Sequence, residues 1–106
     1  MNETIKSLNT LMECTECLGL PHSDINEAKE YLKYNEWGLC FDTITDKMYE
    51  ADIEINEQVY QLIQIIAKNM QLLESDYSCM KNLIKASQSI PTATQNKLLA
   101  IIAKSS

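Results

Sequence analysis

Apolar residues recur every three to four positions along most of this chain, which is the spacing of one face of an α-helix. The first such stripe covers residues 2–18 and stops before Gly19, a suitable C-cap, and Pro21, which blocks continuation. A second follows Ser23, whose side-chain oxygen can cap a helix N-terminus. A third covers residues 36–51. We expect three further helices, beginning at Asn56, at Ser75 or Asp76, and at Thr92 or Thr94.

Each of these helices carries its own set of apolar residues for the core. Outside the third helix the sets are Ile5, Leu8, Met12 and Thr15, with Leu11 and Leu18 at the edge; Ile25, Ala28, Tyr31 and Leu32; Val59, Leu62, Ile63, Ile66, Met70 and Leu73; Tyr77, Met80 and Ile84; and Leu98, Leu99, Ile101 and Ile102. The alternating segment 52–55 lies between two helices and is too short for a strand, so we expect an extended connection. The sequence therefore predicts an all-α fold, a compact bundle of about six helices.

Composition agrees with this fold class. Gly and Pro total only four residues, whereas strand-rich folds need them often in tight turns. Hydrophobic residues make up 45% of the chain, enough to build a core. A length of 106 residues suits one domain, so we expect a single helical domain over residues 1–106.

The third expected helix has two distinct sides. At about 100° per residue, one side is apolar and is expected to pack into the core against the fourth helix. This side comprises Trp37, Cys40, Phe41, Ile44, Met48 and Ala51. The opposite side carries Asp42, Asp46 and Glu50 at intervals of four residues, with Leu39 and Tyr49 among them.

Two interpretations of the acidic side are open. It can be a solvated surface on which Leu39 touches a neighbouring helix. It can also be a binding face, because interfaces combine apolar anchors with charges that steer an opposite partner. Like charges four residues apart repel, so stability alone does not favour this arrangement. Asp52, Glu54 and Glu57 extend the negative charge past the helix.

The formal net charge of −6 bears on the kind of partner. It repels phosphate backbones and favours a basic partner, or simply solubility. No run approaches the ~20 apolar residues that span a bilayer, and the N-terminal segment has no secretion-signal pattern. We therefore expect a cytoplasmic protein with four free thiols that binds neither nucleic acid nor membrane.

The motif CTEC, from Cys14 to Cys17, is the main candidate for chemistry. A redox CxxC normally follows a strand and opens a helix, but this one lies near the end of an expected helix. A structural zinc site would need two more ligands, and Cys40, Cys79 and His22 form no second close pair. We expect neither a metal nor another cofactor.

Other catalytic patterns are also missing from the sequence. His22 is the only histidine and is expected in a surface loop, without a Ser/His/Asp pattern or a Gly-rich phosphate loop. Asp42, Asp46 and Glu50 could reach one cation by spacing. Di-metal bundles, however, use inward-facing Glu-x-x-His pairs, which this chain lacks. We expect no catalytic residues and no enzymatic activity.

Three short motifs lie between Glu27 and Leu72: EWGL at Glu36–Leu39, DIEI at Asp52–Ile55 and KNMQL at Lys68–Leu72. With them, this segment resembles small bacterial immunity proteins of the MafI-like type, whose pattern is E-(Y/W)-G-L-A, D-I-x-I and K-x-M-x-L. The chain departs from that pattern at Cys40, where Ala is usual, and in a C-terminal extension with its own helix.

The resemblance implies a cytoplasmic protein that binds and neutralises a cognate toxin domain, often a nuclease, of a contact-dependent or secreted system. We expect a basic ribonuclease toxin in a 1:1 complex. Gly38 would then allow another helix to approach closely. The expected partner-binding residues are Leu39, Asp42, Asp46, Tyr49, Glu50, Asp52, Glu54 and Glu57. The alternative is a non-enzymatic helical adaptor or regulator of another protein, which the composition supports equally.

Overall fold

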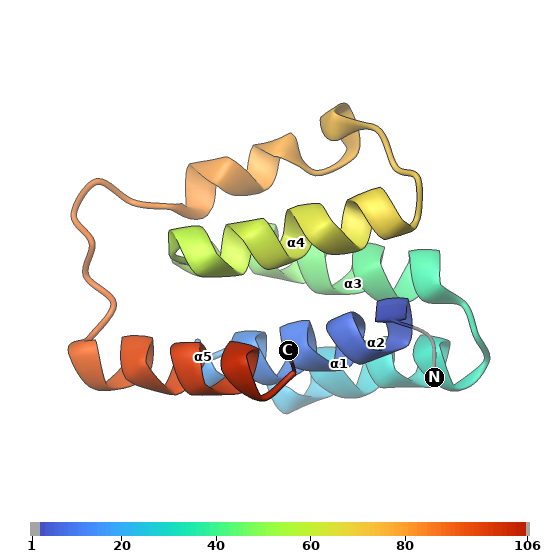
Figure 1. The fold of residues 1–106 in the computed structure, drawn as a ribbon, viewed down its shortest axis with the longest axis horizontal. Helices are drawn as coiled ribbons and strands as arrows, with labels where there is room; N and C mark the ends of the chain where they lie inside the picture. Colours follow the sequence, from blue (N-terminus) through green and yellow to red (C-terminus); the bar gives the residue numbers. More distant parts are fainter. Residues whose placement is uncertain (1–2, 106) are drawn as a thin grey trace.

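The computed structural model describes residues 3–105, and its fold is all-α, as predicted (Figure 1). Asn2, the expected start of the first helix, lies outside the described residues. The described part contains five α-helices and two 3₁₀ segments. In chain order they are α1 (Glu3–Cys17), α2 (His22–Lys33), α3 (Trp37–Glu50), α4 (Glu57–Asn69), η1 (Glu74–Asp76), η2 (Ser78–Leu83) and α5 (Thr92–Lys104).

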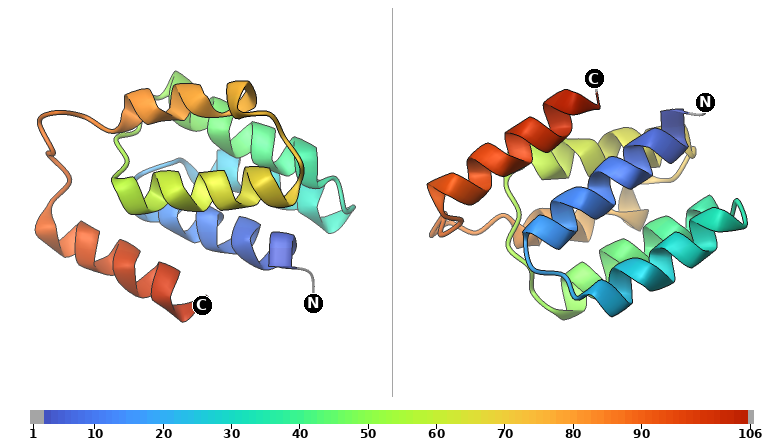
Figure 2. Two further views of the ribbon diagram at one scale, coloured as in Figure 1. Left: turned by 45° about the horizontal axis from the view of Figure 1, so that its top comes forward. Right: turned by 90° about the horizontal axis from the view of Figure 1, so that it is seen from below.

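Helix α1 lies at the centre of the arrangement and packs against α2, α3, α4 and α5 (Figure 2). The expectation that α3 packs mainly on α4 is wrong, because its most extensive packing is with α2 and then α1. Only Tyr34–Glu36 separates α2 from α3. Such a short connection makes consecutive helices antiparallel neighbours.

The buried residues form one hydrophobic core. On α3 the predicted core residues Cys40, Phe41, Ile44 and Met48 are all buried. Trp37 is only partly buried, and its Nε1 is enclosed without a hydrogen-bond partner. Ala51 is exposed, because α3 ends at Glu50 and Ala51 is its C-cap.

Two of the predicted helix ends are confirmed. Gly19 has φ +105° and closes α1 through bonds from its own amide to Glu16 O (3.1 Å) and from Leu20 N to Thr15 O (2.9 Å). This is the two-bond C-cap that favours glycine. Asn56 caps α4 by accepting a bond from Val59 N at 3.0 Å.

Two other helices begin next to a proline. The expected cap Ser23 is wrong, because α2 already begins at His22 with Pro21 as its N-cap. Helix α5 begins at Thr92, one of the two predicted starts, with Pro91 as its N-cap. A proline at this position has the right φ and no amide to satisfy inside the helix.

The expected fifth α-helix is instead the pair η1 and η2. Tyr77, Met80 and Leu83 are buried. Their spacing of three residues matches the 3.0 residues per turn of a 3₁₀ helix. Ile84, predicted for this core set, is half-buried and ends the segment in an isolated parallel bridge with Ile55.

That bridge confirms the extended connection predicted for residues 52–55 only at its end, because Asp52 has φ +51° and lies in the turn that closes α3. The bridge bond runs from Ile55 N to Leu83 O at 2.9 Å, and no longer strand forms in residues 3–105. Leu73 and Leu99, predicted as core residues, are 70% and 49% exposed. Leu73 falls beyond the end of α4, which stops at Asn69.

Candidate functional site

The outward side of α3 carries Leu39, Asp42, Asp46, Tyr49 and Glu50, and all five are exposed, as the helical spacing predicted. We call this set the α3 face. Leu39 and Tyr49 are 47% and 48% exposed, so two apolar surfaces lie open among three carboxylates. Exposed apolar and aromatic groups framed by charge are typical of protein-binding surfaces.

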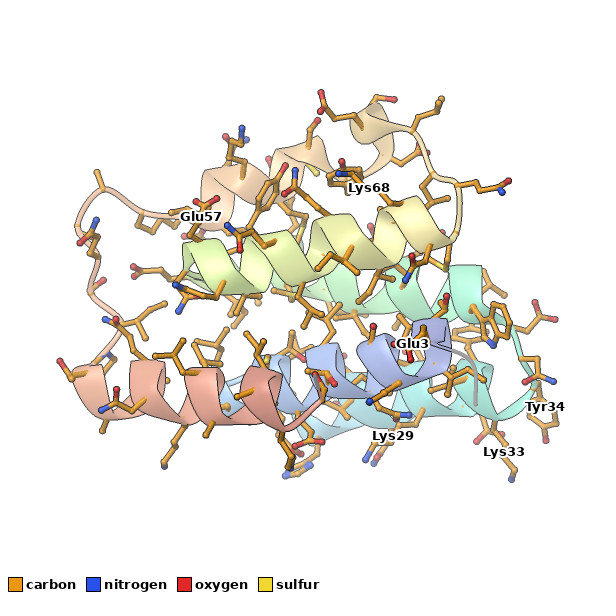
Figure 3. The ribbon with its side chains drawn as sticks, viewed as in Figure 1. Glu3, Lys29, Lys33, Tyr34, Glu57 and Lys68 are labelled. Atoms are coloured by element: carbon orange, nitrogen blue, oxygen red, sulfur yellow. The ribbon has the colours of Figure 1, made fainter. Side chains whose placement is uncertain are left out.

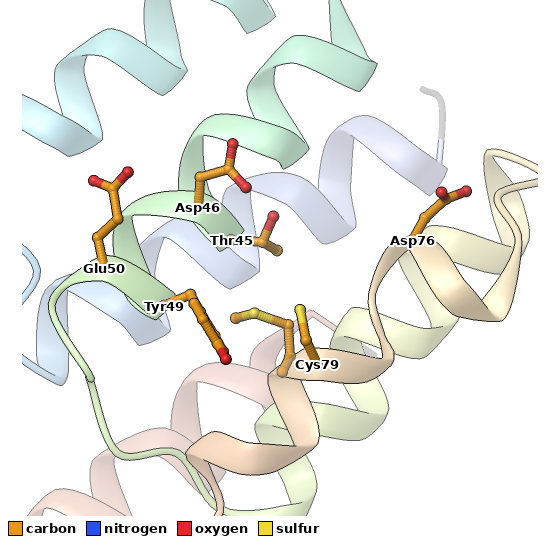
Figure 4. Close-up of a pocket in the computed structure, with 7 residues that line it drawn as sticks. Thr45, Asp46, Tyr49, Glu50, Asp76 and Cys79 are labelled. Atoms are coloured by element: carbon orange, nitrogen blue, oxygen red, sulfur yellow. The ribbon is translucent and has the colours of Figure 1, made fainter.

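A groove with a volume of about 210 Å³ lies between α3 and the segments η1 and η2 (Figure 4). We call it the acidic groove. It is lined by Thr45, Asp46, Tyr49, Glu50, Asp76, Cys79 and Met80. Tyr49 points from α3 toward Cys79. Both Cys79 and Asp76 lie across the groove from α3, on η2 and η1 (Figure 4).

Negative charge is concentrated here with little compensation. The pKa of Asp42 is raised above its ordinary value by partial burial and then by the charges of Asp46 and Asp76. Lys47 lies 4.0 Å from Glu50, at the limit of an ion pair. Among residues 3–105, no cation pairs with Asp42, Asp46 or Asp76. Asp76 Oδ2 does accept a hydrogen bond from Leu73 N at 2.9 Å, so the groove offers carboxylates with little cationic compensation beside an aromatic ring.

Basic residues elsewhere do not gather into one patch. Lys29 and Lys33 lie on α2 and Lys68 at the end of α4, whereas Glu57 lies at the opposite end of α4 (Figure 3). Nucleic-acid surfaces need clustered cations to neutralise phosphates. The lysines labelled in Figure 3 thus lie on different elements and apart from the acidic groove.

The other three predicted partner-binding residues lie beyond the end of α3 and have neighbours of their own. Asp52 pairs with Lys85. Glu54 is half-buried and accepts bonds from Ser89 N at 3.0 Å and Ser89 Oγ at 2.6 Å. Glu57 is exposed and, with Glu54, lines a second groove of about 290 Å³. Thus the predicted continuous acidic zone is divided, and Asp52 and Glu54 already have intramolecular partners.

Asp76, Cys79 and Met80 are groove residues that the sequence reasoning missed. The sequence predicts Asp76 as a possible helix start and Met80 as a core residue, and it assigns neither to a surface site. Their approach to α3 depends on how η2 packs against that helix. The helical spacing within α3 contains no signal for such a contact.

The thiols are all free, and their environments differ. Burial raises the pKa of Cys14 to about 12, with further contributions from Cys17 and Glu13, and burial raises the pKa of Cys40 to about 11. Cys14 and Cys17 lie in the last turns of α1, where the helix dipole disfavours a thiolate. Neither buried thiol is an activated nucleophile.

No metal site is formed by the described residues, in which no group of three or more His, Cys, Asp or Glu side chains is placed to hold an ion. His22 is the first residue of α2 rather than a loop residue. Its side chain is 82% exposed, with Nδ1 2.9 Å from Glu16 Oε2. A solvated pair of this kind on the surface has no nucleophile beside it to activate.

The close approach of a helix expected at Gly38 is not made by any helix within residues 3–105. A Cβ built at Gly38 would meet no heavy atom within 4 Å, so no helix approaches closely there. The missing side chain is therefore not required by packing within this chain.

No family model matches this chain, and no significant match is found among curated proteins or solved structures. Within residues 3–105, no helix combines the length and the apolar character needed to cross a membrane. The resemblance to MafI-like immunity proteins therefore stays a prediction.

Proposed function

We propose that this protein is an immunity protein that binds and neutralises a cognate bacterial toxin domain through the α3 face and the acidic groove. The observation that carries the proposal is that Asp42 and Asp46, which pair with no cation among residues 3–105, share the exposed side of α3 with Leu39 and Tyr49. Exposed carboxylates next to an aromatic ring suit the Lys and Arg side chains of a partner. The motifs between residues 27 and 72 point in the same direction.

The expected partner is a basic nuclease, in particular a ribonuclease of a contact-dependent growth inhibition system. Such an enzyme needs a cationic surface to hold phosphates, and a compact acidic protein can cover that surface. The net charge of −6 favours rapid association with it. The protein then inhibits the enzyme by covering its cationic surface and needs no catalytic group of its own.

The direct test is co-purification with the product of the adjacent upstream gene, followed by a nuclease assay with and without this protein. We expect a 1:1 complex and loss of nuclease activity. An adjacent product that neither binds nor has toxin activity would favour the alternative, a helical adaptor or regulator of another protein.

The surface assignment has its own test. Charge reversal by Asp46→Lys together with Glu50→Lys should weaken toxin binding by at least about tenfold, because desolvated charge pairs are lost and replaced by repulsion. The circular dichroism spectrum should be unchanged, since both residues are exposed. The matched control is Glu27→Lys with Glu30→Lys, an exposed pair on α2, which should leave affinity nearly unchanged. Equal losses in both variants would contradict the assignment to α3.

A further inference from the structure

Helix α5 is the α-helix with the fewest buried residues in the described chain. Leu98 is its one fully buried residue, while Leu99 is 49% exposed and Ile101 and Ile102 are half-buried. It packs chiefly against α1, at the edge of the bundle (Figure 2). Apolar burial alone therefore anchors α5 less firmly than the other helices.

Polar contacts hold the linker that leads to α5. The carboxylate of Glu54 accepts two hydrogen bonds from Ser89, one from its amide and one from its hydroxyl. Asp52 pairs with Lys85 at the start of the same linker. At the other end, Lys104 lies 3.2 Å from Glu13, but this pair is exposed and contributes little. The bonds to Glu54 are also exposed, but Glu54 is the principal tie because its charged carboxylate accepts two bonds from the linker, one of them from the backbone.

Only part of the CTEC motif on α1 faces α5, because consecutive helical residues point about 100° apart. Cys17 lines a hollow together with Lys97, Ala100 and Ile101 of α5. Cys14 lies one turn earlier on the same side and is fully buried. The function proposed above makes no use of either thiol.

We propose that the linker 85–91 and α5 form a strap that opens as a unit from an otherwise folded body, with Glu54 as its latch and Cys14 beneath it. Elements with few buried apolar contacts open locally at a lower free energy than global unfolding. Opening uncovers one side of α1, while the packing of α2 against α3 is kept. The strap is independent of the acidic groove and of any toxin partner.

The test compares two single-cysteine chains, one keeping Cys14 and one keeping Cys40, with the other three cysteines replaced by Ala. Both thiols are fully buried, but Cys40 lies on α3, which packs chiefly on α2. Glu54→Ala removes both acceptors for Ser89. It should speed labelling of Cys14 by a thiol reagent by about tenfold, since bonds to a charged group are lost. Labelling of Cys40 should not change.

The control is Glu27→Ala, an exposed carboxylate on α2, which should alter neither labelling rate. Equal acceleration at Cys14 and Cys40 would mean global unfolding, and no acceleration at Cys14 would mean that Glu54 is not a latch; either result overturns the proposal. If Glu54→Ala fails to fold, Glu54→Gln can be used instead, because it removes the charge but keeps a side-chain oxygen that can accept a bond from Ser89. Hydrogen exchange on the unmodified chain is a second test, in which α5 amides must exchange faster than those of α4.

Discussion

Asp42 shows at the scale of one residue how the charges of the proposed binding surface can oppose stability. Its carboxylate lies near those of Asp46 and Asp76, and burial and both charges raise its pKa. The folded state therefore holds the proton of Asp42 more tightly than the unfolded state does. Ionised Asp42 consequently destabilises the fold, which is the cost expected when charges are kept for a partner.

Asp42→Asn should therefore raise the free energy of unfolding at pH 7. The gain should shrink as the pH falls through the raised pKa of the folded state, and it should vanish below the ordinary Asp pKa of 3.8, where Asp42 is protonated in both states. Urea denaturation followed by circular dichroism across this pH range measures the effect. Glu27→Gln on α2 serves as the control. A variant less stable than the parent chain at pH 7 would contradict the electrostatic argument.

The helical spacing of residues was sufficient to predict which side chains of α3 are buried. It was not sufficient to predict which other segments contact α3. The buried set Cys40, Phe41, Ile44 and Met48 follows from 3.6-residue spacing, as does the exposure of the α3 face. Asp76 and Cys79 join the groove from about thirty residues away in the chain. No local rule places them, because their position depends on how η2 packs against α3.

At the scale of elements, helix ends and helix type were harder to predict than helix existence. Asn56 and Gly19 end their helices through contacts with residues only a few positions away, and both ends were predicted. Tyr77, Met80 and Leu83 recur every third residue, a spacing that a short window does not distinguish from an α-helical stripe. The partner of α3 was also mispredicted, because connection length rather than apolar pattern decides which helices are neighbours.

The two glycines provide a matched test of backbone conformation. Gly19→Ala should destabilise the fold by about 1 kcal/mol or more, because φ +105° is strained for a residue with a Cβ. Gly38→Ala should stabilise it by up to about 1 kcal/mol, since Gly38 is helical and a Cβ there meets open space. Urea midpoints with an unchanged denaturant slope measure both. Destabilisation by Gly38→Ala would show that the helical backbone there cannot accept a side chain.

At the scale of the whole molecule, net charge and the location of its carboxylates act together. The net charge of −6 attracts a basic partner at long range, and the carboxylates of the acidic groove attract its basic side chains at short range. Steering of this kind affects how fast partners meet more than how long they stay together.

The association rate constant with the cognate toxin should therefore fall by about tenfold or more as salt is raised, because ions screen charges beyond about 10 Å at 0.1 M. The dissociation rate should change far less. Surface plasmon resonance at several salt concentrations measures both rates. The Asp46→Lys, Glu50→Lys variant should show a flatter salt dependence. An association rate insensitive to salt would count against an electrostatically steered partner.

The central position of α1 has a consequence for the order in which the chain is made. Helix α1 is synthesised before the four helices that cover it, and α4 begins only at Glu57. At roughly 5–20 residues per second, Leu8, Leu11 and Met12 stay uncovered for several seconds on a growing chain. A nascent chain of this kind offers a hydrophobic helix to ribosome-associated chaperones before its own core can form.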